Sequence, residues 1–149
     1  MRIMGLDLGQ KRIGVAVSDE LGITAQALTT LNRGNFEHDC AALKELAQSY
    51  EVERIVVGLP LSMSGELGRS GEECMAYGNQ LEGYLGVPVV FWDERLSTVA
   101  AEKSLLEGDM RRNRRRRVID QVAACLILDG YLRSGKWAGV GFGGRGSER

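Results

Sequence analysis

The apolar positions in the first third of the chain predict a hairpin, a third strand and a helix. Short apolar runs at 2–8 and 12–18 flank a turn at 9–11, which is typical of a β-hairpin. The run from Ile23 to Leu31 has a strand-like pattern and would extend the hairpin to a meander. Between Phe36 and Tyr50 the apolar residues recur at helical spacing, so a helix is expected there.

The rest of the chain alternates strands and helices. Residues 54–58 and 88–92 are compact apolar runs suited to buried strands, whereas 59–71 is rich in turn-forming residues and predicts a loop. Helices are expected at about 72–85, capped by Gly86, at about 97–107 and at 114–133. Five strands interleaved with helices predict an α/β fold with a mixed sheet flanked by helices.

The composition is that of a single globular domain. The 149 residues are enough to bury a core, and 44% hydrophobic content argues against disorder. Three cysteines without C-x-x-C spacing argue against a disulfide scaffold or a zinc ribbon. No stretch approaches the length of a membrane span, so a cytoplasmic protein is expected. We expect a domain at 1–134 and a Gly-rich flexible tail at 135–149.

Acidic residues stand at the ends of separate predicted elements. Asp7 ends the first strand, Asp93 and Glu94 follow the last strand, and Asp120 lies in the final helix. A carboxylate beside an apolar run is costly unless a cation accompanies it. Because active sites of α/β sheets favour the carboxyl ends of strands, these acids are candidates for a shared site.

Two of these acids also have simpler interpretations. Asp7 could be a turn residue paired with Lys11 or Arg12, and Asp120 could pair with Arg116 one helical turn earlier. Against the second interpretation, helical spacing aligns Asp120 with an apolar stripe made by Ala124, Ile127 and Tyr131.

The remaining acidic position is ambiguous. Taken alone, Asp93, Glu94 and Arg95 are more simply interpreted as a solvated charge cluster after the strand. Side chains alternate along a strand, so only one of Asp93 and Glu94 can face Asp7, and spacing does not choose between them. Carboxylates from three elements suit Mg²⁺ or Mn²⁺, which prefer oxygen ligands. The one histidine, His38, lies in a polar stretch, which argues against a zinc site or a Ser-His-Asp triad. The expected chemistry is metal-assisted phosphodiester cleavage.

A dense basic segment leads into Asp120. Residues 111–117 read RRNRRRR, although the net charge of the chain is only −1. Arginines at a helix N-terminus oppose the macrodipole and repel one another, and a bound phosphate backbone would relieve both effects. The candidate nucleic-acid-binding residues are Lys11, Arg12, Arg95, Arg114, Arg115, Arg116 and Arg117.

Five stretches of the chain together carry a family resemblance. They are GLDLGQKRIGVAVSD (5–19), TAQALTTLNR (24–33), VVGLPLSMSGELG (56–68), DERLST (93–98) and RRRRVIDQVAACLIL (114–128). In combination they resemble the YqgF family, also called RuvX, of Holliday junction resolvase-like proteins and pre-16S rRNA nucleases. They extend over most of residues 1–133.

The resemblance implies a ribonuclease H-like fold with a five-stranded sheet. It also implies that Asp7, Glu94 and Asp120 are the catalytic, metal-binding acids, and so favours Glu94 over Asp93. The implied activity is endonucleolytic cleavage in 5′-end maturation of the 16S rRNA precursor, with branched DNA as an alternative substrate. A homodimer and a ribosomal precursor particle are further expected partners.

Two other function classes compete with a nuclease. A nucleic-acid-binding module without catalysis would share the fold, but the retained acids argue against it. A sugar-kinase or actin-like ATPase would fit the Asp-Leu-Gly at 7–9, but such enzymes need two related domains, and this chain has room for one.

Overall fold

The computed structural model describes residues 2–62, 64–94 and 112–135, and for 112–118 the backbone alone. The elements are β1 (Arg2–Leu8), β2 (Arg12–Ser18), β3 (Ala25–Asn32), α1 (Phe36–Ser49), β4 (Val52–Leu59), α2 (Arg69–Leu85), β5 (Val89–Asp93) and α4 (Arg112–Ser134). The strands lie where the apolar pattern predicted them. The helix expected at 97–107 and the tail at 136–149 lie outside the described residues.

The strands form one five-stranded sheet in the order β3-β2-β1-β4-β5. The pairs β1–β2 and β2–β3 are antiparallel, whereas β1–β4 and β4–β5 are parallel. This confirms the mixed sheet expected from the sequence. The carboxyl ends of β1, β4 and β5 therefore meet the start of β2 and the end of β3 at one edge, which we call the carboxyl edge.

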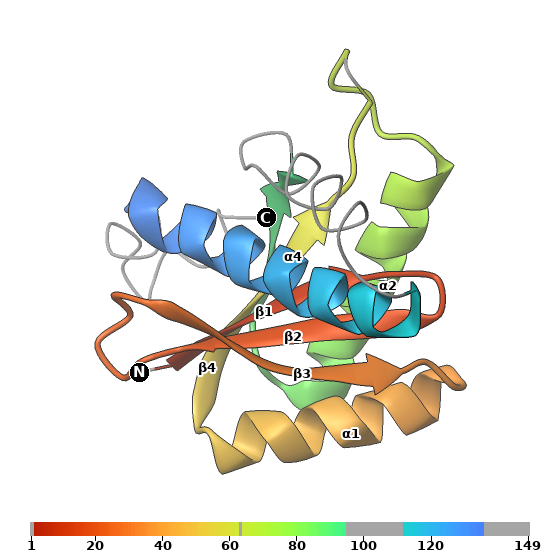
Figure 1. Cartoon of the computed structure of the whole chain (residues 1–149). Coiled ribbons are helices and arrows are strands. Elements are labelled where there is room, and N and C mark those ends of the chain that lie inside the picture. Colours follow the sequence, from red (N-terminus) through yellow and green to blue (C-terminus); the bar gives the residue numbers. More distant parts are fainter. Residues whose placement is uncertain (1, 63, 95–111, 136–149) are drawn as a thin grey trace.

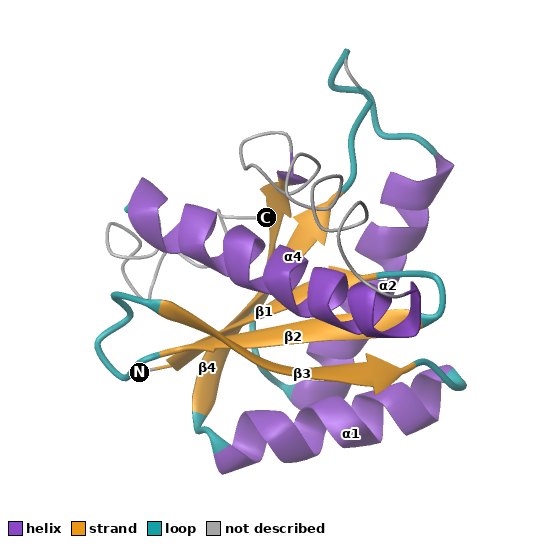
Figure 2. Ribbon diagram, viewed as in Figure 1, coloured by secondary structure: helices purple, strands orange, loops and turns teal. Residues whose placement is uncertain are grey.

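Helices cover both faces of the sheet, with α4 on one face and α1 and α2 on the other (Figures 1 and 2). In β1, Ile3 packs on the α4 face, whereas Met4 and Leu6 pack on the opposite face. The α4 face buries Ala16, Val56, Val90 and Trp92 against Ala124, Ile127 and Leu128. This alternation decides which side chains at the carboxyl edge can meet.

Helix α2 begins earlier than the sequence pattern predicted. The structure starts it at Arg69 rather than at Glu72. Gly71, assigned to the loop because glycine is a turn former, is buried in the first turn, where a Cβ would lie 2.4 Å from Leu67 Cδ1. The helix ends at Gly86, whose φ of 72° gives the left-handed cap that the sequence predicted.

No helix in the described part of the chain combines the length and the apolarity needed to cross a membrane.

Candidate active site

Asp7 lies near the end of β1 and faces α4. Ile3 and Gly5 face α4. Asp7 faces the same way, because side chains two residues apart along a strand point to the same side. Its side chain is only 5% exposed. Such burial distinguishes Asp7 from an exposed turn residue.

Asp120 lies beside Asp7 across Gly14. Gly14 of β2 is the register partner of Asp7 in the antiparallel pair, and a Cβ on Gly14 would lie only 2.0 Å from the Asp120 carbonyl oxygen. Residues paired across a ladder carry their side chains on the same face. The helix backbone at Asp120 therefore approaches the sheet next to Asp7.

The stripe predicted on α4 is buried as expected. Ala124, Ile127 and Tyr131 are at most 4% exposed and pack on the sheet, while Asp120, one turn before them, is half-buried. Asp120 thus continues an inward-facing line of the helix toward the carboxyl edge.

Glu94, rather than Asp93, lies on the α4 face. Val90 and Trp92 pack in the α4-side core, so alternation assigns Glu94 to the same side and Asp93 to the other. The contact at β4 agrees, since a Cβ on Gly58 would lie 2.8 Å from Glu94 Oε1 and 2.4 Å from Ile127 Cδ1. Gly58 thus leaves the space that the Glu94 carboxylate occupies.

The Cys74 thiol lies close enough to Asp7 and Glu94 for their charges to affect it. Burial, and after it the negative charges of Glu94 and Asp7, raises the pKa of the Cys74 thiol to about 12. Two carboxylates from different strands therefore act on one buried group. The thiol donates to the Gly58 carbonyl at 3.3 Å, so Cys74 is a neutral structural residue and not a nucleophile.

The three acids share a face and an edge without forming a closed ligand cage. Among the described residues, no group of three His, Cys, Asp or Glu side chains could hold a metal ion as it stands. The chemistry of the donor set still suits Mg²⁺ or Mn²⁺, because these ions often take one or two carboxylates and complete their shell with water and substrate phosphate.

Two predicted cations lie at the same place. Lys11 and Arg12 line a hollow of about 390 Å³ together with Gly9, Gln10 and Asp120. Arg95 lies outside the described residues. Arg114, Arg115, Arg116 and Arg117 belong to the first turns of α4, whose backbone runs to the carboxyl edge (Figure 1); their side chains are not described.

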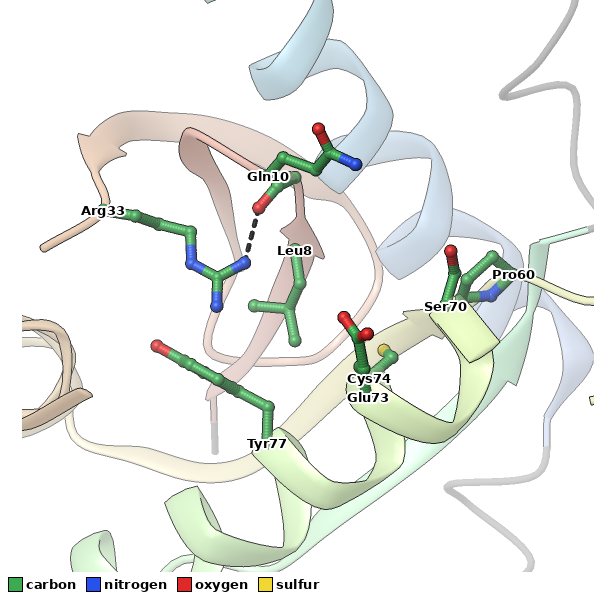
Figure 3. Close-up of a pocket in the computed structure, with 9 residues that line it drawn as sticks. Leu8, Gln10, Arg33, Pro60, Ser70, Glu73, Cys74 and Tyr77 are labelled. Carbon is green, nitrogen blue, oxygen red and sulfur yellow. Dashed lines mark hydrogen bonds between the residues drawn. The ribbon is translucent and has the colours of Figure 1, made fainter. Parts of the chain in front are cut away.

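A second cationic group, missed from the sequence, lies on the opposite face of the same edge. Arg33 Nη1 donates to the Gly9 carbonyl at 2.6 Å, and the guanidinium carbon lies 4.9 Å from the Tyr77 ring centroid (Figure 3). Buried Asp39 accepts from the Tyr77 hydroxyl at 3.1 Å and lies 3.9 Å from Arg33. Burial and then Asp39 raise the pKa of Tyr77, so its hydroxyl remains a donor.

One known protein family matches nearly the whole described part of this chain. A family model described as "RuvX: Holliday junction resolvase" matches residues 1–134. The chain belongs to the RuvX family. A RuvX relative from Moorella thermoacetica is 60% identical over 132 residues, 89% of this chain and 94% of the relative. One from Clostridium beijerinckii is 56% identical over 89% of this chain and 96% of its own. Both are named "Putative pre-16S rRNA nuclease".

Solved structures show the fold of the RuvX chain at low sequence identity. Thermus thermophilus RuvC in complex with a Holliday junction substrate superposes with a TM-score of 0.58 at 17% identity, over 91% of this chain and 97% of that one. The fowlpox virus Holliday junction resolvase superposes with a TM-score of 0.54 at 14% identity, over 90% and 99%. These similarities confirm the ribonuclease H-like fold.

Proposed function

We propose that this RuvX chain is a divalent-metal-dependent endonuclease that cleaves phosphodiester bonds in the 5′-end maturation of the 16S rRNA precursor. The observation that carries the proposal is the position of Asp7, Glu94 and Asp120, three carboxylates from separate elements on the α4 face of one sheet edge. The names of relatives at 56–60% identity supply the substrate class. An enzyme that acts on this precursor would work in the cytoplasm.

The three carboxylates would hold Mg²⁺ or Mn²⁺, which supplies a water nucleophile at neutral pH and offsets the charge that develops on the phosphodiester. The chain's own residues bind and orient the substrate. Lys11 and Arg12 line the hollow next to Asp120 and would hold the phosphates flanking the bond to be cut. The arginines that open α4 would extend this contact along the backbone.

A test compares wild type with Asp7→Asn on a 5′ precursor fragment of 16S rRNA and on a four-way DNA junction. Each reaction is run with Mg²⁺, with Mn²⁺ and with EDTA. We expect cleavage only by wild type with metal, and a melting temperature of Asp7→Asn that shows a folded protein. Cleavage by the Asp7→Asn variant, or by wild type in the presence of EDTA, would contradict the proposal.

The junction resolvase is a second candidate, favoured by the description of the family model. Paired cuts on opposite strands of the DNA junction, with the rRNA fragment left intact, would favour it. A two-fold symmetric homodimer would place one site on each of the two equivalent strands of a junction. Sedimentation with and without junction DNA tests whether this dimer forms. For the rRNA substrate, comparing naked precursor with ribosomal precursor particles tests whether the particle is the true partner.

A further inference from the structure

A pocket on the opposite side of the β1–β2 turn from Asp120 has no role in the activity proposed above. We call it the Arg33 pocket. It has a volume of about 120 Å³. Figure 3 shows that its walls come from four separate segments: the end of β1 with its turn, the residue after β3, the residue after β4, and the first turns of α2. Its lining includes Leu8, Gln10, Arg33, Pro60, Ser70 and Glu73.

The Arg33 pocket and the hollow at Asp120 lie on the two sides of the β1–β2 turn. Gly9 and Gln10 line both this pocket and the hollow that contains Asp120. Cys74, which also lines the pocket, is close enough to Asp7 and Glu94 for both to raise its pKa. A nucleic-acid strand that crosses the β1–β2 turn from the carboxylates therefore passes the mouth of this pocket.

Arg33 gives the pocket a fixed planar wall. Its guanidinium is held by the Gly9 carbonyl, by the ring of Tyr77 and by buried Asp39, and the side chain remains 29% exposed. A guanidinium plane ordered in this way is a surface on which a nucleobase can stack. Leu8 and Pro60 add apolar walls.

The polar groups of the pocket suit a base edge better than a phosphate. Gln10 offers an amide donor and acceptor, Ser70 a hydroxyl, and Glu73 a carboxylate that only accepts. Arg69 pairs with Glu73 at 3.2 Å, yet the Glu73 side chain is still 70% exposed. A phosphate would be repelled by the Glu73 carboxylate, whereas the amino and imino groups of a base donate hydrogen bonds to it.

We propose that the Arg33 pocket binds one unpaired nucleobase of the substrate, on the nucleotide adjacent to the bond that is cut. This inference rests on the proposed nuclease function and narrows its substrate, because a base inside a duplex cannot enter such a pocket without leaving its stack. The preferred substrate is then a strand that is single-stranded at the cut, such as a precursor end or a junction branch point.

The test pairs a change in the protein with a change in the substrate. Cleavage of a single-stranded oligonucleotide is compared with that of oligonucleotides in which one base is removed, the abasic nucleotide being moved stepwise past the cut. The first variant is the double substitution Gln10→Ala, Ser70→Ala, at the exposed rim of the pocket. The second is Glu73→Gln, and its matched control is Glu72→Gln, because Glu72 is also on α2 but does not line the pocket.

At one abasic position we expect wild type to lose about 10-fold in kcat/KM, in the range of a lost base contact. The double substitution and Glu73→Gln should each lose activity on the intact strand and lose no more on that abasic strand, whereas Glu72→Gln should behave as wild type. Equal losses by the variants on intact and abasic strands, or indifference of wild type to every abasic position, would overturn the pocket's role while leaving the nuclease in place.

A binding arm keeps the inference separate from the nuclease activity. The Asp7→Asn protein is mixed in EDTA with single-stranded oligonucleotides that carry 2-aminopurine at successive positions, so that no cut site has to be known. Fluorescence quenching that the double substitution abolishes supports the base pocket even if wild type cuts nothing. An unchanged quench in the double substitution contradicts it.

Discussion

The β2 backbone at Gly14 lies directly against the Asp120 carbonyl of α4, where a Cβ would lie 2.0 Å from the oxygen. Both groups belong to main chain, so the contact cannot be relieved by turning a side chain. Since Gly14 is also the register partner of Asp7, this contact sets the distance between two of the three candidate acids.

Replacing Gly14 with alanine should push α4 away from the sheet. We expect a loss of about 3 kcal/mol in the free energy of unfolding, the upper part of the range for overpacking, and a larger loss of cleavage than the stability change explains. Chemical denaturation and cleavage assays measure the two effects. The control is Gly83→Ala, where a Cβ meets nothing within 4 Å and which should stabilise α2 by about 0.5–1 kcal/mol. Equal behaviour of the two variants would contradict the close contact.

The arginines that begin α4 should contribute salt-dependent binding. Changing Arg114 to Arg117 together to alanine removes four cations, so the slope of log K against log salt should fall by about 3, at roughly 0.7 per single-strand phosphate. Fluorescence anisotropy at several salt concentrations measures the slope. Arg133→Ala, at the far end of α4 and paired with Asp129 at 2.9 Å, should leave it unchanged. A slope that does not fall in the fourfold variant removes the phosphate role of this segment.

Asp19 should make the β2–β3 turn sensitive to acid. Its carboxylate accepts from the backbone amides of Thr24 at 3.1 Å and Ile23 at 2.7 Å, and these bonds hold its pKa below the ordinary 3.8. A lowered pKa in the folded state stabilises the protein above the ordinary value, and this contribution disappears as pH falls through the lowered pKa.

The matched variant is Asp19→Asn, which keeps an oxygen acceptor and loses the charge. It should be less stable than wild type at pH 7, and the difference should shrink at a pH below 3.8. Urea denaturation at the two pH values measures it. A difference that is the same at both values would show that the charge of Asp19 is not what the turn recognises.

The strands could be predicted from the sequence because alternation and apolar runs report local burial directly. The choice between Asp93 and Glu94 could not, since it depends on which face of β5 lies under α4, a fact set by Val90 and Trp92 in the assembled sheet. Only the family resemblance favoured Glu94 beforehand, and in the structure Glu94 is the one of the two that lies on the α4 face.

The Arg33 pocket could not be predicted from the sequence for a different reason. Its walls are distant in sequence, and Asp39, which holds Arg33 and Tyr77, stands in the first turn of α1, where an acid is already explained by the helix dipole. The early start of α2 was missed because Gly71 looks like a turn former until its packing on Leu67 is seen.

The most direct test of the account compares two neighbouring acids under the same conditions. Glu94→Gln and Asp93→Asn are matched neutral substitutions, assayed with Mg²⁺ on the single-stranded precursor end, with melting curves to verify folding. We predict that Glu94→Gln loses about 100-fold or more in kcat, at or beyond the range for residues that only orient a metal ligand, and that Asp93→Asn retains most of its activity. Equal losses in the two variants, or a loss in Asp93→Asn alone, would contradict a catalytic site on the α4 face.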